Sequence, residues 1–396
     1  MTFEIAQLCD IDVDVIDGDR GKNYPHQDEL LESGYCLFLS AKNVTQNGFL
    51  FADNQFITQE KDGLLNNGKL NRGDIVITNR GTVGNVAIYS DDVPYRNIRI
   101  NSGMLIIRCG ENIDNYYLYQ VLRSKWFYNQ ILSIQSGSAQ PQLPKSHFLK
   151  MTIPMPDIDT QHKIAIILSG IGDKISVNTA INENLEHQAY LLLEQMLSAP
   201  HNEICSLSDI ANINPRYTLS KRTEARYIDM SQLSTTTSFP DGWTFRPYNG
   251  GMKFKNKDTI MARITPCLEN GKTAYIDFLE EDETAFGSTE YIVLSPKDNI
   301  PPELLYCIVR YPEFRTYATI NMNGSSGRQR VSGEIIGKYE IPQFTQEELS
   351  EFGAVAEPLF KQITENSLQN RNLSALRDTL LPKLMNGEID VSNIKI

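Results

Sequence analysis

Two kinds of hydrophobic pattern alternate along the chain. In residues 1–156 and 201–344, short runs of apolar and β-branched residues such as "DIVIT", "GMLIIRC" and "EYIVLS" are separated by Gly, Asn and Pro. This pattern predicts strands and turns. Each segment also contains one stretch of helical pattern, "NYYLYQVLRSKWFYNQIL" in the first and "PPELLYCIVRYPEFRTYA" in the second. We therefore expect two α+β domains.

A different pattern fills residues 157–200 and 345–385, where apolar positions recur at alternating spacings of four and three, as in the seam between two packed helices. The first seam comprises Ile164, Leu168, Ile171, Ile175, Asn178, Asn182, Leu185, Ala189, Leu192 and Met196. Adding 188 gives the second: Phe352, Ala356, Leu359, Ile363, Asn366, Asn370, Leu373, Arg377, Leu380 and Leu384. Pro382 predicts that the second helix ends or kinks near Leu381, because the residue before a proline is pushed out of helical geometry.

The whole chain is an internal repeat. "EIAQLCDI" from Glu4 returns as "EICSLSDI" from Glu203, and "GSAQPQLPKSHFLKMTIP" from Gly137 matches "SSGRQRVSGEIIGKYEIP" from Ser325. The two helical segments align without a gap over 23 positions, of which seven are identical, where unrelated sequences would share one or two. The last residues, 386–396, resemble a third, truncated start of the repeat. We expect this tail to return to the first domain, which requires the two long helices to run antiparallel.

Four asparagines interrupt the apolar seam near its middle. In an antiparallel pair related by an approximate two-fold axis, Asn178 lies close to Asn370 and Asn182 close to Asn366. Facing amides can satisfy each other, and a buried Asn specifies register at some cost in stability. The alternative is that these asparagines face solvent or a partner protein.

Composition is that of an ordinary globular protein. Of the 396 residues, 41% are apolar and 22% charged, and no apolar run approaches the roughly 20 residues that span a bilayer. The acidic N-terminus lacks the features of an export signal, so we expect a cytoplasmic protein. The six cysteines form no C-x-x-C pair, and we expect all of them to be core thiols. The net charge is −12, but residues 1–156 and 201–344 are nearly balanced, at −3 and −2.

The motifs of catalysis are missing. "NPRY" at Asn214–Tyr217 lacks the second proline of the N-P-P-Y tetrapeptide of amino-methyltransferases, and no glycine-rich cofactor loop precedes it. "GKT" at Gly271–Thr273 lacks the upstream glycine of a phosphate-binding loop. The sequence contains neither H-E-x-x-H nor the E-x-K of many nucleases. We therefore expect no catalytic site, cofactor or metal in this chain.

Polar, basic, glycine- and serine-rich loops recur in both repeats, including "TNRGTVG" (78–84), "GSAQPQLPKS" (137–146) and "GSSGRQR" (324–330). Arg, Asn and Gln can read base edges, while Lys and Ser hold phosphates. For any single loop, a solvated turn is the simpler interpretation, but the recurrence in both repeats favours binding. The candidate DNA-binding residues are Arg20, Lys22, Lys42, Asn43, Arg80, Arg96, Arg99, Gln140, Gln142, Lys145, Arg263, Arg328, Gln329 and Arg330.

Over essentially its whole length the chain resembles the DNA-specificity subunits of type I restriction-modification systems. The matching features are "DGDRGKNYP", "SGSAQPQL" with "IPMP", "SSGRQRV" and "LRDTLLPKLMNGEI", in the order domain, helix, domain, helix. The resemblance implies that each domain reads one half of a split DNA target. It also implies that the helices bind two adenine-methyltransferase subunits, which flip the target base, and that a motor-nuclease subunit joins for cleavage.

Two other classes of protein remain open at this point. A self-contained restriction or methylation enzyme would methylate DNA alone, which the missing motifs argue against. A coiled-coil adaptor that binds only proteins would leave the loops as mere turns, and would show no sequence-specific DNA binding even with its partners.

Overall fold

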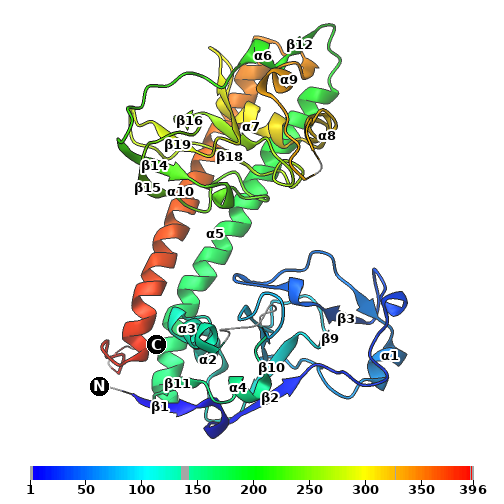
Figure 1. Ribbon diagram of the computed structural model, residues 1–396, viewed down its shortest axis with the longest axis vertical. Helices are drawn as coiled ribbons and strands as arrows, with labels where there is room; N and C mark the ends of the chain where they lie inside the picture. Colours follow the sequence, from blue (N-terminus) through cyan, green and yellow to red (C-terminus); the bar gives the residue numbers. More distant parts are fainter. Residues whose placement is uncertain (1–2, 135–141, 326, 393, 395–396) are drawn as a thin grey trace. The chain divides into compact units, whose positions relative to one another are not determined.

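The computed structural model describes residues 3–134, 142–325, 327–392 and 394. It divides into two units (Figure 1): unit 1 consists of residues 1–173 and 373–396, and unit 2 of residues 174–372. Each unit contains one sheet-rich domain and a part of both long helices, so the chain passes from unit to unit along those helices.

The central sheet of unit 1 has the strand order β2-β10-β7-β8 and is buried on both faces. Because side chains alternate along a strand, Ile75 and Ile77 enter one core, while Val76 between them enters the other. A smaller sheet, β6-β3-β9, contributes to the second core. The strands are β1 (Glu4–Gln7), β2 (Val13–Asp17), β3 (Cys36–Leu39), β4 (Val44–Thr45), β5 (Gly48–Phe49), β6 (Phe56–Ile57), β7 (Ile75–Thr78), β8 (Val86–Ile88), β9 (Ile98–Ile100), β10 (Met104–Cys109) and β11 (Thr152–Met155).

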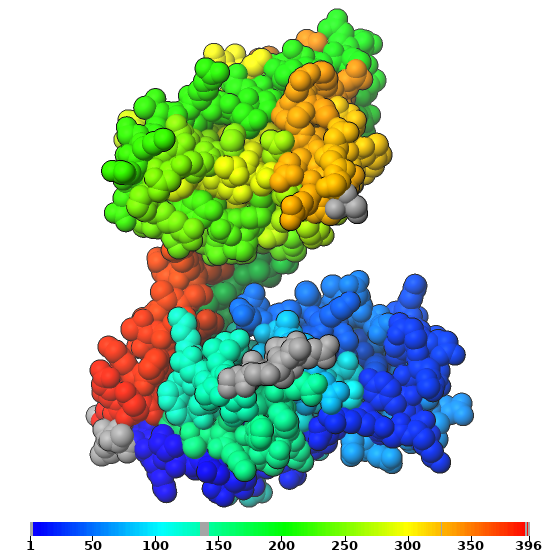
Figure 2. Space-filling model, viewed as in Figure 1, coloured from blue at the N-terminus to red at the C-terminus, as the bar shows by residue number. Residues whose placement is uncertain are grey.

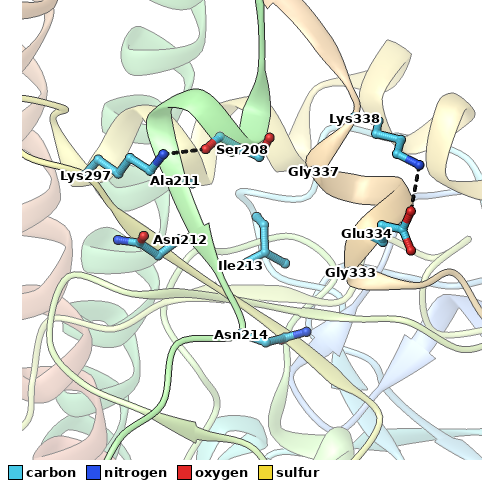
Figure 3. A pocket seen from close by; sticks show the side chains of 10 residues that line it. All are labelled: Ser208, Ala211, Asn212, Ile213, Asn214, Lys297, Gly333, Glu334, Gly337 and Lys338. Carbon is cyan, nitrogen blue, oxygen red and sulfur yellow. Dashed lines mark hydrogen bonds and ion pairs between the residues drawn. The ribbon is translucent and has the colours of Figure 1, made fainter.

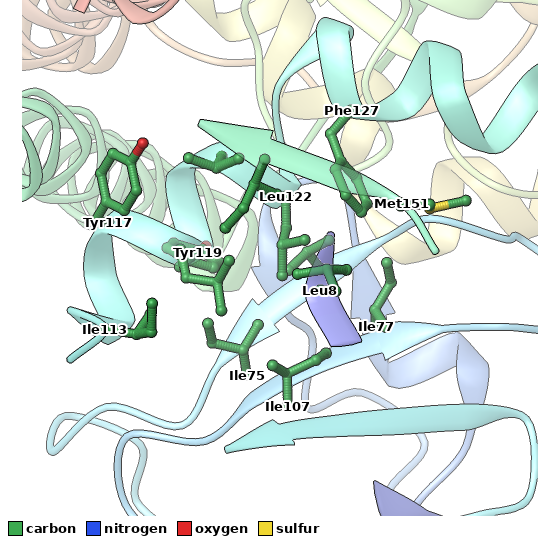
Figure 4. Packing of buried hydrophobic residues seen from close by; sticks show 14 of the residues in the cluster. Leu8, Ile75, Ile77, Ile107, Ile113, Tyr117, Tyr119, Leu122, Phe127 and Met151 are labelled. Carbon is green, nitrogen blue, oxygen red and sulfur yellow. The ribbon is translucent and has the colours of Figure 1, made fainter. Parts of the chain in front are cut away.

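Helices and the C-terminal segment close the first core of unit 1. Figure 4 shows part of this core, including side chains from the sheet and from α2 and α3. Leu381, Leu384 and Val391 pack into this core, and the Lys163 ammonium donates to the carbonyl of Ser392 at 2.6 Å. The C-terminal residues thus lie beside the N-terminal strand (Figure 2). The helices are α1 (Gln59–Leu64), α2 (Asn115–Leu122), α3 (Lys125–Ile134) and α4 (Lys145–Phe148), and the 3-10 turns η1 (Leu8–Asp10), η2 (Gln27–Glu29) and η3 (Ala41–Asn43).

Unit 2 repeats this topology. Its central sheet has the order β13-β20-β17-β18, the counterpart of β2-β10-β7-β8, and β12 pairs with β21 as β1 pairs with β11. The α+β prediction, with two copies of one domain, is confirmed. The elements are β12 (Ile204–Ser206), α6 (Leu207–Ile210), β13 (Ala211–Ile213), β14 (Glu224–Ile228), η4 (Met230–Gln232), β15 (Thr244–Pro247), β16 (Lys253–Phe254), β17 (Thr259–Ala262), β18 (Thr273–Tyr275), β19 (Ala285–Gly287), β20 (Tyr291–Pro296), α7 (Pro302–Arg310), α8 (Pro312–Ile320), α9 (Gly333–Gly337) and β21 (Glu340–Pro342).

The two long helices are α5 (Ile158–Ser198) and α10 (Gln346–Met385). Every predicted seam position on both helices is buried or half-buried. By length and composition alone α5 could cross a membrane. However, its buried Asn178, Asn182 and Glu186 all hydrogen-bond within unit 2, as expected of a helix packed against protein.

Three local predictions from the sequence were wrong. The helix α10 does not end at Leu381 but continues to Met385, with Pro382 in its last turn, because the buried Leu384 and Met385 hold that turn against the core. Each predicted domain helix is two helices. Cys9 is exposed, so not every cysteine is a core thiol.

The break within each domain helix has a local cause. In unit 1 the Ser124 hydroxyl donates to the carbonyl of Val121 at 2.6 Å and accepts from the amide of Phe127, which ends α2 and begins α3. In unit 2 Pro312 has no N–H to continue α7, and the extended Tyr311 separates α7 from α8.

Candidate nucleic-acid interface

In unit 2, backbone hydrogen bonds join the loop that follows β17 to the segment Arg328–Val331. The amide of Thr265 donates to the carbonyl of Gln329 at 3.1 Å, and the amide of Val331 donates to that of Arg263 at 3.0 Å. Arg328 is exposed, while Gln329 and Arg330 are half-buried. The fold therefore brings together basic side chains from loops about 65 residues apart in the sequence.

Unit 1 joins its two corresponding loops in the same way. The amide of Leu143 donates to the carbonyl of Asn79 at 2.9 Å, and Arg80 forms a β-bridge with Gln142. Arg20 lies near this pair, because its guanidinium is 3.5 Å from the carbonyl of Ser102, next to Gly103, which accepts from the amide of Arg80. Arg20, Arg80 and Gln142 thus lie around one turn.

The backbone bonds define equivalent positions in the two units. Asn79 donates to the carbonyl of Gly103 at 2.9 Å just as Arg263 donates to that of Glu290 at 3.0 Å, and the β-bridge of Gln142 corresponds to that of Arg330. We call these three positions the paired-loop frame. It is occupied by Asn79, Gly103 and Gln142 in unit 1, and by Arg263, Glu290 and Arg330 in unit 2.

In unit 2 the frame is charged. The Arg330 guanidinium donates to both carboxylate oxygens of Glu290, with Nη2 2.8 Å from Oε1 and Nε 2.9 Å from Oε2. This contact holds the pKa of Glu290 below its usual value. The Arg263 Nε is 3.9 Å from Glu290, buried, and without a hydrogen-bond partner among the described residues. The Glu290 carboxylate therefore lies between two guanidinium groups but hydrogen-bonds only that of Arg330. The Nε–H donor of Arg263 has no acceptor among the described residues.

In unit 1 the frame is neutral, because Asn79, Gly103 and Gln142 stand where unit 2 has three charged residues. Arg80 and Gln142 are exposed, and their side chains make no hydrogen bond or ion pair with other residues that the structure describes. Arg20 is paired with Asp17 at 3.2 Å, but its side chain remains 50% exposed. These groups are available to an external ligand.

The remaining candidates separate into free and occupied side chains. Lys22, Lys42 and Arg96 are exposed, and Lys145 is half-buried at the start of α4. Within the described part of the chain, no hydrogen bond or ion pair engages these four side chains. Gln140 lies outside the described residues.

Arg99 and Asn43 have structural roles, so the prediction that they face DNA does not fit the structure. Arg99 is 6% exposed, and its guanidinium binds the Asp62 carboxylate at 2.6 Å together with three carbonyl oxygens. Asn43 is 3% exposed and donates to the carbonyls of Leu50 and Ala52. Sequence pattern cannot separate such side chains from free ones, because both kinds occur in stretches of polar and basic residues.

Sequence reasoning missed Asn79 and Glu290. Both lie next to strands of the central sheets, so alignment of the two repeats by their strands would have placed Asn79 opposite Arg263 and Gly103 opposite Glu290. The search for basic residues passed over them because neither is basic.

The four seam asparagines lie together in unit 2. Asn178 Nδ2 donates to Oδ1 of Asn370 at 2.9 Å, and Asn366 Nδ2 donates to Oδ1 of Asn182 at 2.8 Å. From one pair to the next the residue number increases on α5 and decreases on α10, so this part of α5 runs antiparallel to α10. Three of the four are buried, and Asn370 is half-buried.

A surface pocket of about 490 Å³ lies between α6, β13 and α9 of unit 2 (Figure 3). Its two lysines are occupied, since Lys297 donates to the carbonyl of Ser208 and Lys338 to the Glu334 carboxylate, both at 2.7 Å. The described residues contain no cluster of His, Cys, Asp or Glu that could hold a metal ion.

A duplicated α+β domain, with the same loop frame carrying different side chains in each copy, defines a protein with two equivalent but chemically distinct binding surfaces. The chain belongs to the family of the type I restriction modification DNA specificity domain, whose model matches residues 1–187 and 201–348.

The chain is similar to related proteins over most of its length. It is 24% identical to the type I restriction enzyme MjaIX specificity subunit of Methanocaldococcus jannaschii, over 82% of this chain and 79% of that protein. It is 21% identical to the HindI specificity subunit of Haemophilus influenzae, over 94% and 98%. The crystal structure of a type I S subunit from M. genitalium has the same fold, with a TM-score of 0.57, 15% identity and coverage of 97% and 96%. These similarities do not support the adaptor alternative.

Proposed function

We propose that this chain is the DNA-specificity subunit of a type I restriction-modification complex, and that each domain reads one half of a bipartite target. The observation that carries the proposal is the paired-loop frame. The same backbone hydrogen bonds hold the exposed Gln142 in unit 1, with Asn79 buried beneath the loop, but hold the half-buried Arg263 and Arg330 in unit 2. One scaffold with different donors and acceptors is what two readers of different base sequences require.

The proposed organisation follows the repeat. The target-recognition domains are residues 1–156 and 201–344, the spacer helices are residues 157–200 and 345–385, and residues 386–396 form the returning tail. The two helices form an antiparallel coiled coil, in which the asparagine layers fix the register. The helices of 41 and 40 residues, at about 1.5 Å a residue, give rods of about 60 Å, and we propose that this length sets the spacer between the half-sites.

The proposed partners supply the chemistry. Two methyltransferase subunits dock on the helices and flip their target adenines, and a motor-nuclease subunit joins for cleavage. The specificity chain itself needs no cofactor and acts in the cytoplasm, where its DNA target lies. The proposal is supported by family membership and by the missing catalytic motifs.

The isolated chain should bind DNA only weakly. Its net charge is −12 and neither recognition domain is net basic, so it lacks the phosphate neutralisation that drives most DNA affinity. Specificity should therefore appear in the complex with methyltransferase. Tight, sequence-selective binding by the chain alone at physiological salt would contradict this.

The most informative test is methylome sequencing of cells with and without the gene for this chain. The proposal predicts the loss of methylation from one bipartite adenine motif. An unchanged methylome, in cells shown to contain the active methyltransferase subunit, would contradict it.

A further inference from the structure

One loop of the second recognition domain contacts both long helices. The clasp loop, residues 234–243, joins η4 to β15, and all of its contacts described here lie within unit 2. Helix α5 meets the loop near Ser238, and helix α10 meets it at Trp243.

The contact with α5 is a buried carboxylate. Glu186 is 4% exposed, and its Oε2 accepts from the backbone amide of Ser238 at 3.0 Å. Its Oε1 accepts from the hydroxyls of Tyr306 at 2.6 Å and Tyr190 at 2.9 Å. A buried carboxylate is tolerated only when donors satisfy it. The bonds to Ser238 and Tyr306 fix the loop and α7 on one side of α5, while Tyr190 lies on α5 itself.

The contact with α10 is a cation over an aromatic ring. The Arg371 guanidinium lies 3.8 Å from the centre of the Trp243 ring, which also stacks on Phe278 at 4.4 Å. No carboxylate of the described residues pairs with Arg371, whereas the nearby Arg226 is paired with Glu283. Burial and the neighbouring Arg226 lower the pKa of Arg371. Trp243 is therefore the main partner of this cation.

Both contacts lie next to the asparagine layers. Glu186 is one helical turn from Asn182, and Arg371 directly follows Asn370. The clasp loop thus holds the domain where the seam fixes the register of the two helices.

Unit 1 has the arginine-to-loop contact of this arrangement but lacks the carboxylate on the helix. Arg123 donates to the carbonyl of Gln46 at 2.9 Å and to the Tyr119 hydroxyl at 3.0 Å, as Arg310 donates to the carbonyl of Thr235 in unit 2. The repeat places Ser374 on α10 where α5 has Glu186. Ser374 forms no side-chain hydrogen bond with the described residues. The helix carboxylate of the clasp is therefore specific to the second domain.

We propose that the clasp loop, held by Glu186 on α5 and by Arg371 on α10, positions the second recognition domain on the helix pair and so restricts the spacer lengths that the complex accepts. Glu186, Trp243 and Arg371 are positioning residues and do not read bases. This inference rests on the proposed function of the chain.

The test compares methylation of DNA duplexes that carry the native spacer with duplexes one base pair shorter or longer, using the complex with methyltransferase subunits. Glu186→Gln places an amide NH₂ against either the Ser238 amide or the two tyrosine hydroxyls. Arg371→Ala removes the nearer of the two cations over Trp243, the other being Arg226 at 5.2 Å, and Arg371→Lys keeps a charge there. Glu183→Gln, which removes an exposed carboxylate from the same helix, is the matched control.

Glu186→Gln and Arg371→Ala should each reduce the preference for the native spacer by about tenfold, because weakening either the buried Glu186 contact or the Arg371–Trp243 contact permits other domain settings. Arg371→Lys should retain more of that preference than Arg371→Ala, and Glu183→Gln should retain all of it. An equal loss of methylation on all three spacers, with the preference unchanged, would show a purely structural role and overturn the inference. If Glu186→Gln does not fold, the comparison of Arg371→Ala with Arg371→Lys tests the inference by itself.

Failure of the proposed function gives a different result. In that case the wild-type complex would methylate no bipartite target, so no spacer preference could be measured for any variant.

Discussion

The two units bury the same aspartate in different ways. In unit 1 the Arg108 guanidinium binds both oxygens of Asp74, at 2.9 and 2.7 Å. In unit 2 the repeat places Ser295 where Arg108 stands, and Asp258 instead accepts from the Tyr217 hydroxyl at 3.0 Å. Both aspartates also accept from a backbone amide three residues earlier, at 2.7 and 2.8 Å. The repeat thus keeps the turn that a carboxylate caps and changes only how its charge is balanced.

The paired-loop frame at the proposed interface likewise keeps its backbone contacts in both units and changes its charged groups. Its side chains are neutral in unit 1 and charged in unit 2. The clasp extends the rule to the helices, because Tyr119 and Arg123 of unit 1 have counterparts in Tyr306 and Arg310, but only α5 adds a carboxylate. Backbone geometry is thus shared, and side-chain charge distinguishes the two domains.

The largest expected difference between the units comes from removing the cation beside Asp74. Arg108→Ala leaves an aspartate that is 2% exposed without its partner, and should destabilise unit 1 by about 3 kcal/mol. Ser295→Ala in unit 2 removes a neutral group and should cost about 1 kcal/mol. Amide hydrogen exchange, followed separately in each unit, measures both effects. Equal costs would show that the ion pair is not what stabilises unit 1.

Substitutions in each unit should change recognition of only one half of the DNA target. Arg328→Ala should cost about 2 kcal/mol of binding and relax one position of the second half-site only, if Arg328 contacts a base. Gln142→Ala should act in the same way on the first half-site. Binding of the methyltransferase complex to single-base variants of the target measures this. A changed preference in the first half-site for Arg328→Ala would refute the assignment of domains, and a uniform loss would identify a phosphate contact.

The asparagine layers should lower stability while fixing register. Replacing Asn182 and Asn366 together by Leu removes both partners of a buried pair, and should stabilise unit 2 by about 1 kcal/mol. The same double variant should broaden the accepted spacer length, because the seam then contains no polar layer at that level. Thermal unfolding and methylation of spacer variants measure the two effects. Lower stability with an unchanged spacer would dispose of the register role.

The last expected effect is a dependence of the stability of unit 2 on pH. Burial raises the pKa of Asp258 to about 6, from an ordinary value of 3.8. Because the folded protein holds this proton more tightly than the unfolded chain, the resulting stabilisation is fully present below the ordinary value. It is lost as the pH rises through about 6. Hydrogen exchange in unit 2 should therefore show lower stability at pH 7.5 than at pH 5, and Asp258→Asn should reduce that difference. An unaltered pH profile in the variant would rule out Asp258 as its source.

Much of this architecture could be predicted from the sequence because the repeat and the heptad spacing are properties of the chain itself. The two α+β domains and the seam positions follow from periodicity. The availability of side chains does not, because it depends on contacts between distant segments. Arg99 and Arg80 both belong to polar, basic stretches of one domain, yet Arg99 lies in strand β9 and binds Asp62, while Arg80 is exposed in the loop after β7. The role of Glu186 could not be predicted from the sequence either, since its partners Ser238 and Tyr306 lie 52 and 120 residues away.

The central claim is that one duplicated scaffold carries two independent readers. Exchanging residues 201–344 for the matching segment of a relative with a different target, followed by methylome sequencing, tests it most directly. The account predicts that one half of the methylated motif changes to that of the relative, while the other half and the spacer length stay the same. A motif changed in both halves, or one unchanged throughout with the exchanged protein folded and active, would contradict it.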